Sequence, residues 1–224
     1  MRFLLPLIAG TALAAATAPA TAAPRPWTAV ATPVATGSYL IGNPKARVKL
    51  VEYVSYTCPH CAHFEHEAEP TLAAMVRSGS TSVEIRNQVH DGIDLAAATL
   101  ARCAGATAFP KVHAAFFAQQ EQWVSRADTW AQGNRERIAS WPQLAQLSAI
   151  AEGAGLTTIA RAAGMPAAAI TACFANDAAV KRTIAASEAT AKVSGTPAFE
   201  INGRLIQNVG WTQLQPQLRA AGAK

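Results

Sequence analysis

The sequence is short of charge, of aromatic residues and of cysteine. Charged residues make up 15% of the 224 positions and aromatic residues 7%, and no block of lysine or arginine stands out although the net charge is +5. Without a basic block we expect no nucleic-acid partner. Four cysteines are too few for a small domain held together by disulfides. Because half of the residues are apolar and no repeat is present, we expect one large domain or one domain with an insertion.

The N-terminal apolar run is too short and too alanine-rich to span a membrane comfortably. It covers residues 3–18, follows Arg2 and leads into small residues, which is the three-part pattern of a secretory signal peptide. An uncleaved membrane anchor is the alternative interpretation. No cysteine lies near the expected cleavage point after Ala22 or Ala23, so we expect no lipoprotein anchor. The mature chain is therefore expected to be a soluble, periplasmic protein.

The next part of the chain predicts a strand, a helix and a second strand. Residues 48–54 are β-branched and mostly apolar, as in a strand buried on both faces of a sheet, and residues 82–89 alternate with the period of a strand. Between them a helix is expected to begin at Pro59, because proline is favoured at the first helical position, and to run to about Arg77. Together they have the size of a βαβ unit.

The middle of the chain is rich in alanine with helical spacing. We expect about five to seven helices over residues 93–193, separated by glycine and proline. The strand pattern returns at 197–201, turns at the Asn-Gly pair 202–203 and continues over 204–209; Asn-Gly between apolar runs is a strong hairpin signal. A final helix is expected over about 212–220.

These elements predict an α/β fold, namely a thioredoxin fold whose βαβ and ββα halves are separated by an inserted all-helical domain. The expected organisation is a signal peptide at 1–23, an extended leader at 24–36, a thioredoxin-like domain at 37–91 and 194–224, and a helical insertion domain at 92–193.

Cys58 and Cys61 form a C-x-x-C motif at the start of the expected helix. Unpaired backbone N–H groups and the positive end of the helix dipole should stabilise a thiolate at Cys58 and lower its pKa. Cys61, one turn deeper on the same face, can resolve a mixed disulfide on Cys58 and should be the more buried thiol. The two cysteines are therefore the expected redox-active disulfide. A partly charged His60 between them would make it a stronger oxidant, although a solvent-facing spacer is the alternative.

Metal binding is the competing use of the motif, since zinc and copper both take cysteine and histidine ligands. On one helix His63 points well away from the cysteines, and His66 lies roughly 12 Å along the axis from Cys58. No second C-x-x-C motif exists. We therefore expect no metal site and no cofactor, and we interpret both histidines as residues of the helix surface.

Residues 51–61 (VEYVSYTCPHC), with Gly195-Thr196-Pro197 after a long helical segment, resemble the DsbA family of periplasmic thiol:disulfide oxidoreductases. The likeness covers nearly the whole mature chain in the order of its elements, and CPHC is the motif typical of the family. The resemblance implies that Cys58 attacks substrate and accepts the mixed disulfide and that Cys61 resolves it. The Pro59-His60 dipeptide between them then belongs to the catalytic motif.

The resemblance also implies further catalytic residues. Pro197 would be the family's cis-proline, facing the disulfide across the active site, and the backbone of Thr196 would pair with a substrate peptide as a short strand. Glu52, six residues before Cys58 in an apolar strand, matches the family's buried carboxylate near the resolving cysteine. Such a group could relay a proton when Cys61 becomes the attacking thiolate. An edge-exposed strand residue without a role is the alternative for Glu52.

Cys103 and Cys173 fall in the helical segment, far from the motif. In an exported chain with an oxidising motif we expect them to form a structural disulfide. Two buried free thiols, or a relay that exchanges with Cys61, are the alternatives. Closing a loop of roughly 70 residues would stabilise the fold by about 4 kcal/mol in the chain-entropy model.

The expected function is that of a monomeric dithiol oxidase. The oxidised cysteine pair would give its disulfide to unfolded exported proteins, and a membrane partner of the DsbB type, implied by the resemblance, would reoxidise it. Disulfide isomerisation or reduction is the alternative; family isomerases add an N-terminal dimerisation domain, for which residues 24–36 are too few. From a different functional class, a non-enzymatic copper or zinc chaperone or a peptide-binding module could retain the same fold.

Overall fold

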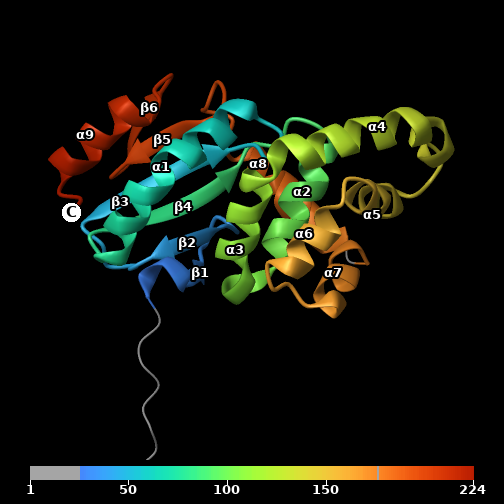
Figure 1. Cartoon of the computed structure of the whole chain (residues 1–224), viewed down its shortest axis with the longest axis horizontal. Helices are drawn as coiled ribbons and strands as arrows, with labels where there is room; N and C mark the ends of the chain where they lie inside the picture. The colour runs from blue at the N-terminus through green and yellow to red at the C-terminus, as the bar shows by residue number, and fades with distance from the viewer. Residues whose placement is uncertain (1–25, 176) are drawn as a thin grey trace, which may run out of the picture.

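The computed structural model describes residues 26–175 and 177–224. A six-stranded sheet with helices on both sides adjoins a body made only of helices (Figure 1). The expected signal peptide at 1–23, its alternative as a membrane anchor and the first two leader residues lie outside the described residues. Within the described ranges, no helix is both long and apolar enough to cross a membrane.

The sheet has the strand order β1-β2-β4-β3-β5-β6. Neighbouring strands β3 and β4 are parallel, and all other neighbours are antiparallel. β3 lies inside the sheet, and its residues are buried except for Lys49, as its β-branched sequence predicts. The strands are β1 (Ala31–Pro33), β2 (Tyr39–Gly42), β3 (Val48–Val54), β4 (Thr81–Asn87), β5 (Ala198–Ile201) and β6 (Arg204–Gln207).

Two features of the sheet have no counterpart in the predicted elements. Residues 31–33 of the leader form the edge strand β1, which pairs with β2, and β2 in turn pairs with β4. Both strands are short and follow a 3-10 turn, η1 (Trp27–Ala29). Strands of three and four residues are too short to show an alternating pattern, which explains why the sequence does not reveal them.

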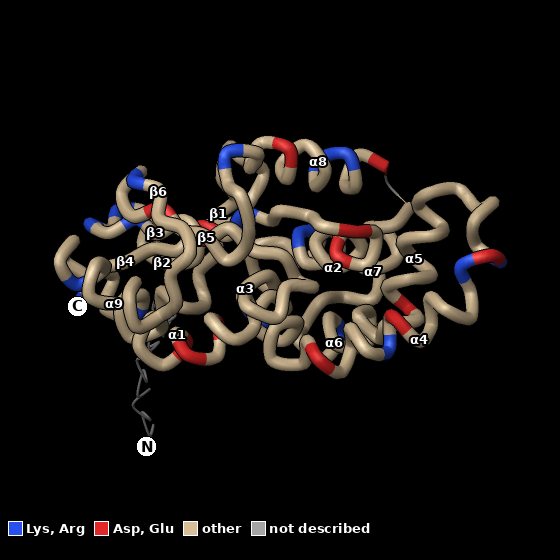
Figure 2. Tube along the Cα trace, turned by 90° about the horizontal axis from the view of Figure 1, so that it is seen from above, with Lys and Arg blue, Asp and Glu red and all other residues tan. Residues whose placement is uncertain are grey.

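Helices α1 and α9 lie on one side of the sheet, and α8 lies on the other (Figures 1 and 2). Between β4 and β5 the described chain forms seven helices, which is within the expected range. The sheet and these helices together confirm the predicted thioredoxin-like fold with a helical insertion. The helices are α1 (Pro59–Arg77), α2 (Gly92–Cys103), α3 (Gly105–Ala118), α4 (Gln120–Ile138), α5 (Gln143–Gly153), α6 (Leu156–Ala162), α7 (Ala167–Phe174), α8 (Asp177–Glu188) and α9 (Trp211–Ala221).

The core positions α1 firmly against the sheet. Apolar residues recur every three or four positions along α1 and are buried, as in an amphipathic helix. Its Phe64 ring lies 4.5 Å from the ring of Phe199 in β5 and 5.9 Å from that of Trp211 in α9. Aromatic contacts of this kind are worth about 0.5–1.5 kcal/mol beyond the area they bury. The first turn of α1, which carries the C-x-x-C motif, is therefore held by packing on both later elements of the sheet domain.

A disulfide joins two helices of the insertion. Cys103 is the last residue of α2, Cys173 lies in α7, and their Cα atoms are 5.7 Å apart. The sulfur atoms of both residues are thus bonded to each other, and neither is a free thiol. The cross-link closes a long loop, which in the chain-entropy model lowers the entropy of the unfolded chain.

Candidate active site

The C-x-x-C motif lies where β3 leads into α1. Cys58 is the N-cap residue of α1, with extended backbone angles, and Pro59 occupies the first helical position. Cys58 is only 8% exposed, and Cys61 one turn further is fully buried. Both cysteines are free thiols in this structure. The predicted difference in burial between the two thiols therefore follows from the position of the motif at the start of a packed helix.

The pKa of Cys58 is lowered from its ordinary value to about 5. The largest cause is a hydrogen bond from the Cys61 thiol, and the backbone N–H groups of Cys61 and His60 add to it, while burial acts in the opposite direction. Such donors stabilise an anion at a helix start. Cys58 is thus a thiolate at neutral pH and is suited to be both nucleophile and leaving group.

The pKa of Cys61 is raised, chiefly because the thiol is buried and secondly because it donates its proton to Cys58 and feels the negative charge there. The two cysteines therefore differ sharply although they are chemically identical. In the reduced pair, Cys58 carries the charge and Cys61 carries the proton. This is the division between an attacking thiol and a resolving thiol.

Thr196 and Pro197 face the motif from the loop before β5. The Thr196–Pro197 peptide bond is cis, and the Cys58 thiol donates a hydrogen bond to the carbonyl oxygen of Thr196 over 3.2 Å. The hydroxyl of Thr196 is buried and has no hydrogen-bond partner among the described residues. When Cys58 loses its proton the carbonyl can no longer accept from it, and the Thr196 hydroxyl then stabilises the thiolate by donating to it.

The two middle residues of the motif face solvent. Pro59 and His60 are exposed, and His60 acts on Cys58 through its backbone N–H. The imidazole lines a cavity of about 310 Å³ that also includes Thr196 and Pro197. His60 is thus placed to meet a substrate that approaches Cys58 along the cis-proline loop.

Glu52 is buried in β3, with 1% of its surface exposed, between the neighbouring strands β4 and β5. The alternative of an edge-exposed residue is therefore wrong. Its pKa is raised well above the ordinary value, first by burial and then by the charge of Glu65 and a hydrogen bond with it. Glu65 lies on α1 one turn after Cys61, on the same side of the helix. Burial therefore favours the protonated form of Glu52, which interacts with the helical turn that follows the resolving cysteine.

Glu65 also contacts the helical insertion, where its partner is a buried histidine. His113 of α3 contacts Glu65 Oε1 through Nε2 at 3.0 Å and Tyr56 Oη through Nδ1 at 2.9 Å. Sequence analysis did not identify Glu65 or His113. The spacing of four residues between Cys61 and Glu65 could have indicated the first, whereas no local pattern marks the second.

The loop before the motif is held by two further polar residues that sequence analysis missed. Asp94, near the start of α2, accepts hydrogen bonds from Ser55 Oγ at 2.6 Å and from the Tyr56 N–H at 2.8 Å. Burial raises the pKa of Asp94 to about 6. From the first turn of α4, Gln120 Nε2 donates to the carbonyl oxygens of Tyr56 at 2.9 Å and Cys58 at 2.8 Å. The insertion therefore fixes the backbone that carries Cys58.

A second and larger cavity lies on the other side of the motif. Its volume is about 1060 Å³, and it runs between α1 and α4 from Thr57 and Pro59 onwards. No lysine or arginine is among its described lining residues. The motif thus lies between two cavities, a smaller one at the cis-proline loop and a larger one next to the insertion. Among residues 26–175 and 177–224, no group of three or more His, Cys, Asp or Glu has an arrangement that could hold a metal ion.

Comparison with known proteins gives consistent matches. A family model described as Thioredoxin matches residues 35–220. The crystal structure of a protein-disulfide isomerase from Novosphingobium aromaticivorans is 36% identical and superposes with a TM-score of 0.75, covering 84% of this chain and 98% of that chain. The structure of α-DsbA1 from Wolbachia pipientis is 18% identical, with a TM-score of 0.60 over 82% of this chain and 90% of that chain, and shows the same fold.

Among curated proteins, one from Rickettsia prowazekii that is provisionally named a protein-disulfide oxidoreductase is 31% identical over 174 residues. The alignment covers 75% of this chain and 56% of that protein. A relative from Rickettsia conorii is 31% identical over 169 residues and is covered to 53%. The chain therefore spans little more than half the length of the curated relatives that it matches.

Proposed function

Because this chain belongs to the thioredoxin-like DsbA family of protein-disulfide oxidoreductases, we propose that it is a periplasmic dithiol oxidase that introduces disulfides into exported proteins. The observation that carries this proposal is the difference between the two active-site thiols, with the pKa of Cys58 at about 5 and that of Cys61 raised. A thiolate that is stable in the reduced pair makes the disulfide a strong oxidant.

The reaction begins with the oxidised Cys58–Cys61 pair. A substrate thiolate attacks the Cys58 sulfur, the Cys58–Cys61 bond breaks, and Cys61 leaves as a thiolate that takes up a proton. A second substrate thiolate then attacks the mixed disulfide at the substrate sulfur and releases Cys58 as its stabilised thiolate. The substrate gains a disulfide, and two electrons pass to the cysteine pair. A membrane disulfide donor of the DsbB type, in accepting these two electrons, restores the oxidised pair.

Thr196 and Glu52 support these steps. The Thr196 backbone beside the cis-proline pairs with an extended substrate next to Cys58, a role supported by its carbonyl oxygen lying 3.2 Å from the Cys58 sulfur. The Thr196 hydroxyl and the neighbouring backbone N–H groups stabilise the departing Cys58 thiolate. Glu52, whose raised pKa favours its protonated form and which interacts through Glu65 with the turn after Cys61, supplies or accepts the proton of the resolving thiol.

One observation favours isomerisation as a second candidate function, namely the 36% identity to a protein whose structure is described as a protein-disulfide isomerase. An isomerase acts in its reduced form on a wrong disulfide, whereas an oxidase acts in its oxidised form on free thiols. The two functions therefore require opposite starting states of the same Cys58–Cys61 pair.

The test compares the oxidase and isomerase activities of the mature, monomeric protein on one substrate that contains several disulfides. We expect the oxidised protein to oxidise the reduced, unfolded substrate at stoichiometric amounts. The Cys61→Ser variant should instead accumulate a mixed disulfide with the scrambled substrate, because its Cys58 thiolate attacks a substrate disulfide and releases the other substrate sulfur as a thiolate. A Cys58→Ser variant that keeps full activity would exclude the mechanism. Faster rearrangement of a scrambled substrate by the reduced protein, with little net oxidation by the oxidised one, would establish the isomerase instead.

A further inference from the structure

A small cavity beside the Cys103–Cys173 disulfide is lined by two arginines. It has a volume of about 200 Å³ and lies between the turn that joins β1 to β2, helix α2 and helix α8. Arg102 of α2 and Arg182 of α8 both line it, and its described lining includes no aspartate or glutamate. Two positive charges therefore face a hollow in which the described chain provides no negative charge.

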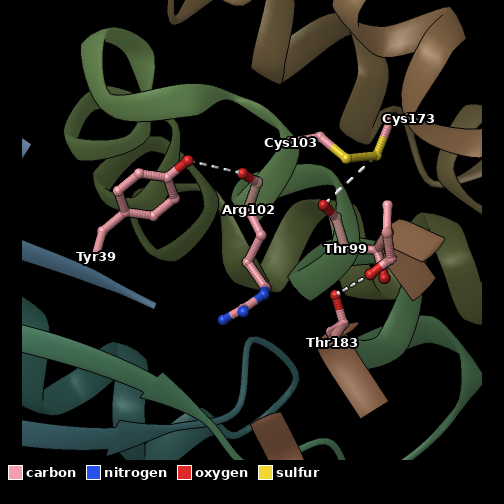
Figure 3. Close-up of a disulfide and its surroundings, with 7 residues drawn as sticks. Tyr39, Thr99, Arg102, Cys103, Cys173 and Thr183 are labelled. Carbon is pink, nitrogen blue, oxygen red and sulfur yellow. Dashed lines mark hydrogen bonds between the residues drawn. A yellow bond between two sulfur atoms is a disulfide. The ribbon is translucent and has the colours of Figure 1, made fainter. Parts of the chain in front are cut away.

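Arg102 is the more buried of the two arginines. Its Nη2 donates a hydrogen bond to the carbonyl oxygen of Gly37, while its Nη1 is buried without a hydrogen-bond partner in the described residues. Figure 3 shows its side chain extending away from the disulfide, with none of the other labelled side chains reaching the guanidinium group. Burial lowers the pKa of Arg102, and the like charge of Arg182 lowers it further. A buried cation without a counter-charge is costly, so a bound anion would stabilise this arrangement.

Thr99 provides a third polar group at the same place. It precedes Arg102 by three residues, so both side chains lie on one side of α2, and it lines the same cavity. Its hydroxyl is buried and lacks a hydrogen-bond partner in the described part of the chain. The same cavity is therefore lined by two residues that each carry a buried, unpartnered donor, which is unusual for buried polar atoms unless a ligand or water completes them.

We propose that this cavity is a binding site for a small oxyanion of the size of phosphate or sulfate, held by Arg102, Arg182 and Thr99. Guanidinium groups bind such oxygens through paired, charge-assisted hydrogen bonds, and a hydroxyl donates a further one. A bound anion would join the edge of the sheet to α2 and α8 of the insertion. The site shares no lining residue with the two cavities beside Cys58 and goes beyond the proposed function.

The experiment titrates the oxidised, mature protein with sodium phosphate, and in parallel with sulfate and with chloride at matched ionic strength. Calorimetry measures binding, and the melting temperature measures stabilisation. We expect saturable binding of phosphate and sulfate, with a rise in melting temperature of at least about 2 °C. Arg182→Gln and Arg102→Gln should each weaken phosphate binding at least tenfold. Arg161→Gln, which removes an exposed arginine of α6 outside the cavity, should leave it unchanged.

The absence of saturable binding would overturn the proposal, as would an equal response to chloride, because simple screening of two like charges needs no site. Wild-type affinity in the Arg182→Gln variant would overturn it too. Arg182 is exposed, so that variant decides the question even if Arg102→Gln fails to fold. Disulfide exchange at Cys58–Cys61 should proceed normally in Arg182→Gln, so a failure here is distinct from a failure of the proposed oxidase activity.

Discussion

At the scale of single residues, the chemistry depends on one proton shared unequally between two thiols. Cys58 receives hydrogen bonds from Cys61, from backbone N–H groups and from the Thr196 hydroxyl, while burial keeps the proton on Cys61. The sequence predicts this difference, because a cysteine at a helix start and a cysteine one turn deeper have different surroundings. It does not predict the hydroxyl of Thr196 as a donor, since Cys58 and Thr196 lie 138 positions apart in the sequence.

The reduced protein should contain a thiolate that titrates near pH 5. Because the pKa of Cys58 is lower in the folded than in the unfolded chain, this group adds stability that is fully present above about pH 9 and is lost as the pH falls to about 5. The slope should be at most about 1.4 kcal/mol per pH unit. The measurement is the free energy of unfolding of the reduced protein minus that of the oxidised protein, obtained with denaturant at each pH. Burial raises the pKa of Asp94 to about 6, which has the opposite effect on stability, but this contribution is present in both forms and cancels in the difference. A pH-independent difference contradicts the assignment.

Glu52→Gln should slow the steps in which Cys61 gains or loses its proton. Glutamine copies the shape of the protonated acid, so we expect little change in stability at neutral pH. The rate of mixed-disulfide formation by the oxidised protein should fall at least about tenfold, because Cys61 takes up its proton in that step. Stopped-flow measurements with a thiol substrate give that rate and its pH profile. The pH midpoint at which Cys58 titrates should not change in this variant. Glu152→Gln, on an exposed position of α5, is the matched control; an unchanged pH profile in Glu52→Gln removes the proton-relay role.

At the scale of elements, the helical insertion acts on the active site through the loop that precedes Cys58. Asp94 from α2 and Gln120 from α4 together fix the backbone of Ser55, Tyr56 and Cys58. The boundaries of α1, β4, β5 and α9 agree closely with the predictions because capping, alternation and the Asn-Gly turn are local signals. The two anchoring residues could not be predicted, since nothing near either residue in sequence indicates which loop it meets.

Gln120→Ala should remove the donors of two buried carbonyl groups. We expect a loss of about 1–3 kcal/mol in the free energy of unfolding and a less oxidising Cys58–Cys61 pair, because the backbone N–H groups around the thiolate become less well fixed. Urea unfolding and the glutathione equilibrium measure the two effects. Gln122→Ala, an exposed position on the same helix, should leave both unchanged. A loss of stability with an unchanged redox equilibrium would assign Gln120 a purely structural role.

At the scale of the whole molecule, the sheet domain carries the reactive cysteines while the insertion encloses one side of them. The Cys103–Cys173 disulfide lies within the insertion, and its two cysteines are separated by 70 positions. In Figure 2 the acidic and basic residues of the described chain are spread along the whole trace rather than gathered in one part of it.

The double variant Cys103→Ser/Cys173→Ser should separate structure from catalysis. Loss of the cross-link should lower the free energy of unfolding by about 4 kcal/mol or less, through the greater entropy of the unfolded chain. Chemical denaturation measures this loss. Because these residues are not among the groups that set the pKa of Cys58, the glutathione equilibrium of Cys58 and Cys61 should not change. A changed equilibrium would point instead to a redox relay between the two cysteine pairs.

The central claim is that the structure makes the Cys58–Cys61 pair a strong oxidant, and the glutathione equilibrium of the purified mature protein tests it most directly. The oxidised and reduced pair are quantified by mass after acid quenching, with Cys103 and Cys173 followed separately. We predict a reduction potential of about −180 to −120 mV, well above the glutathione couple, with the reduced form more stable to denaturant than the oxidised form. A potential near that of thioredoxin, about −270 mV, would contradict the account and indicate a reductase.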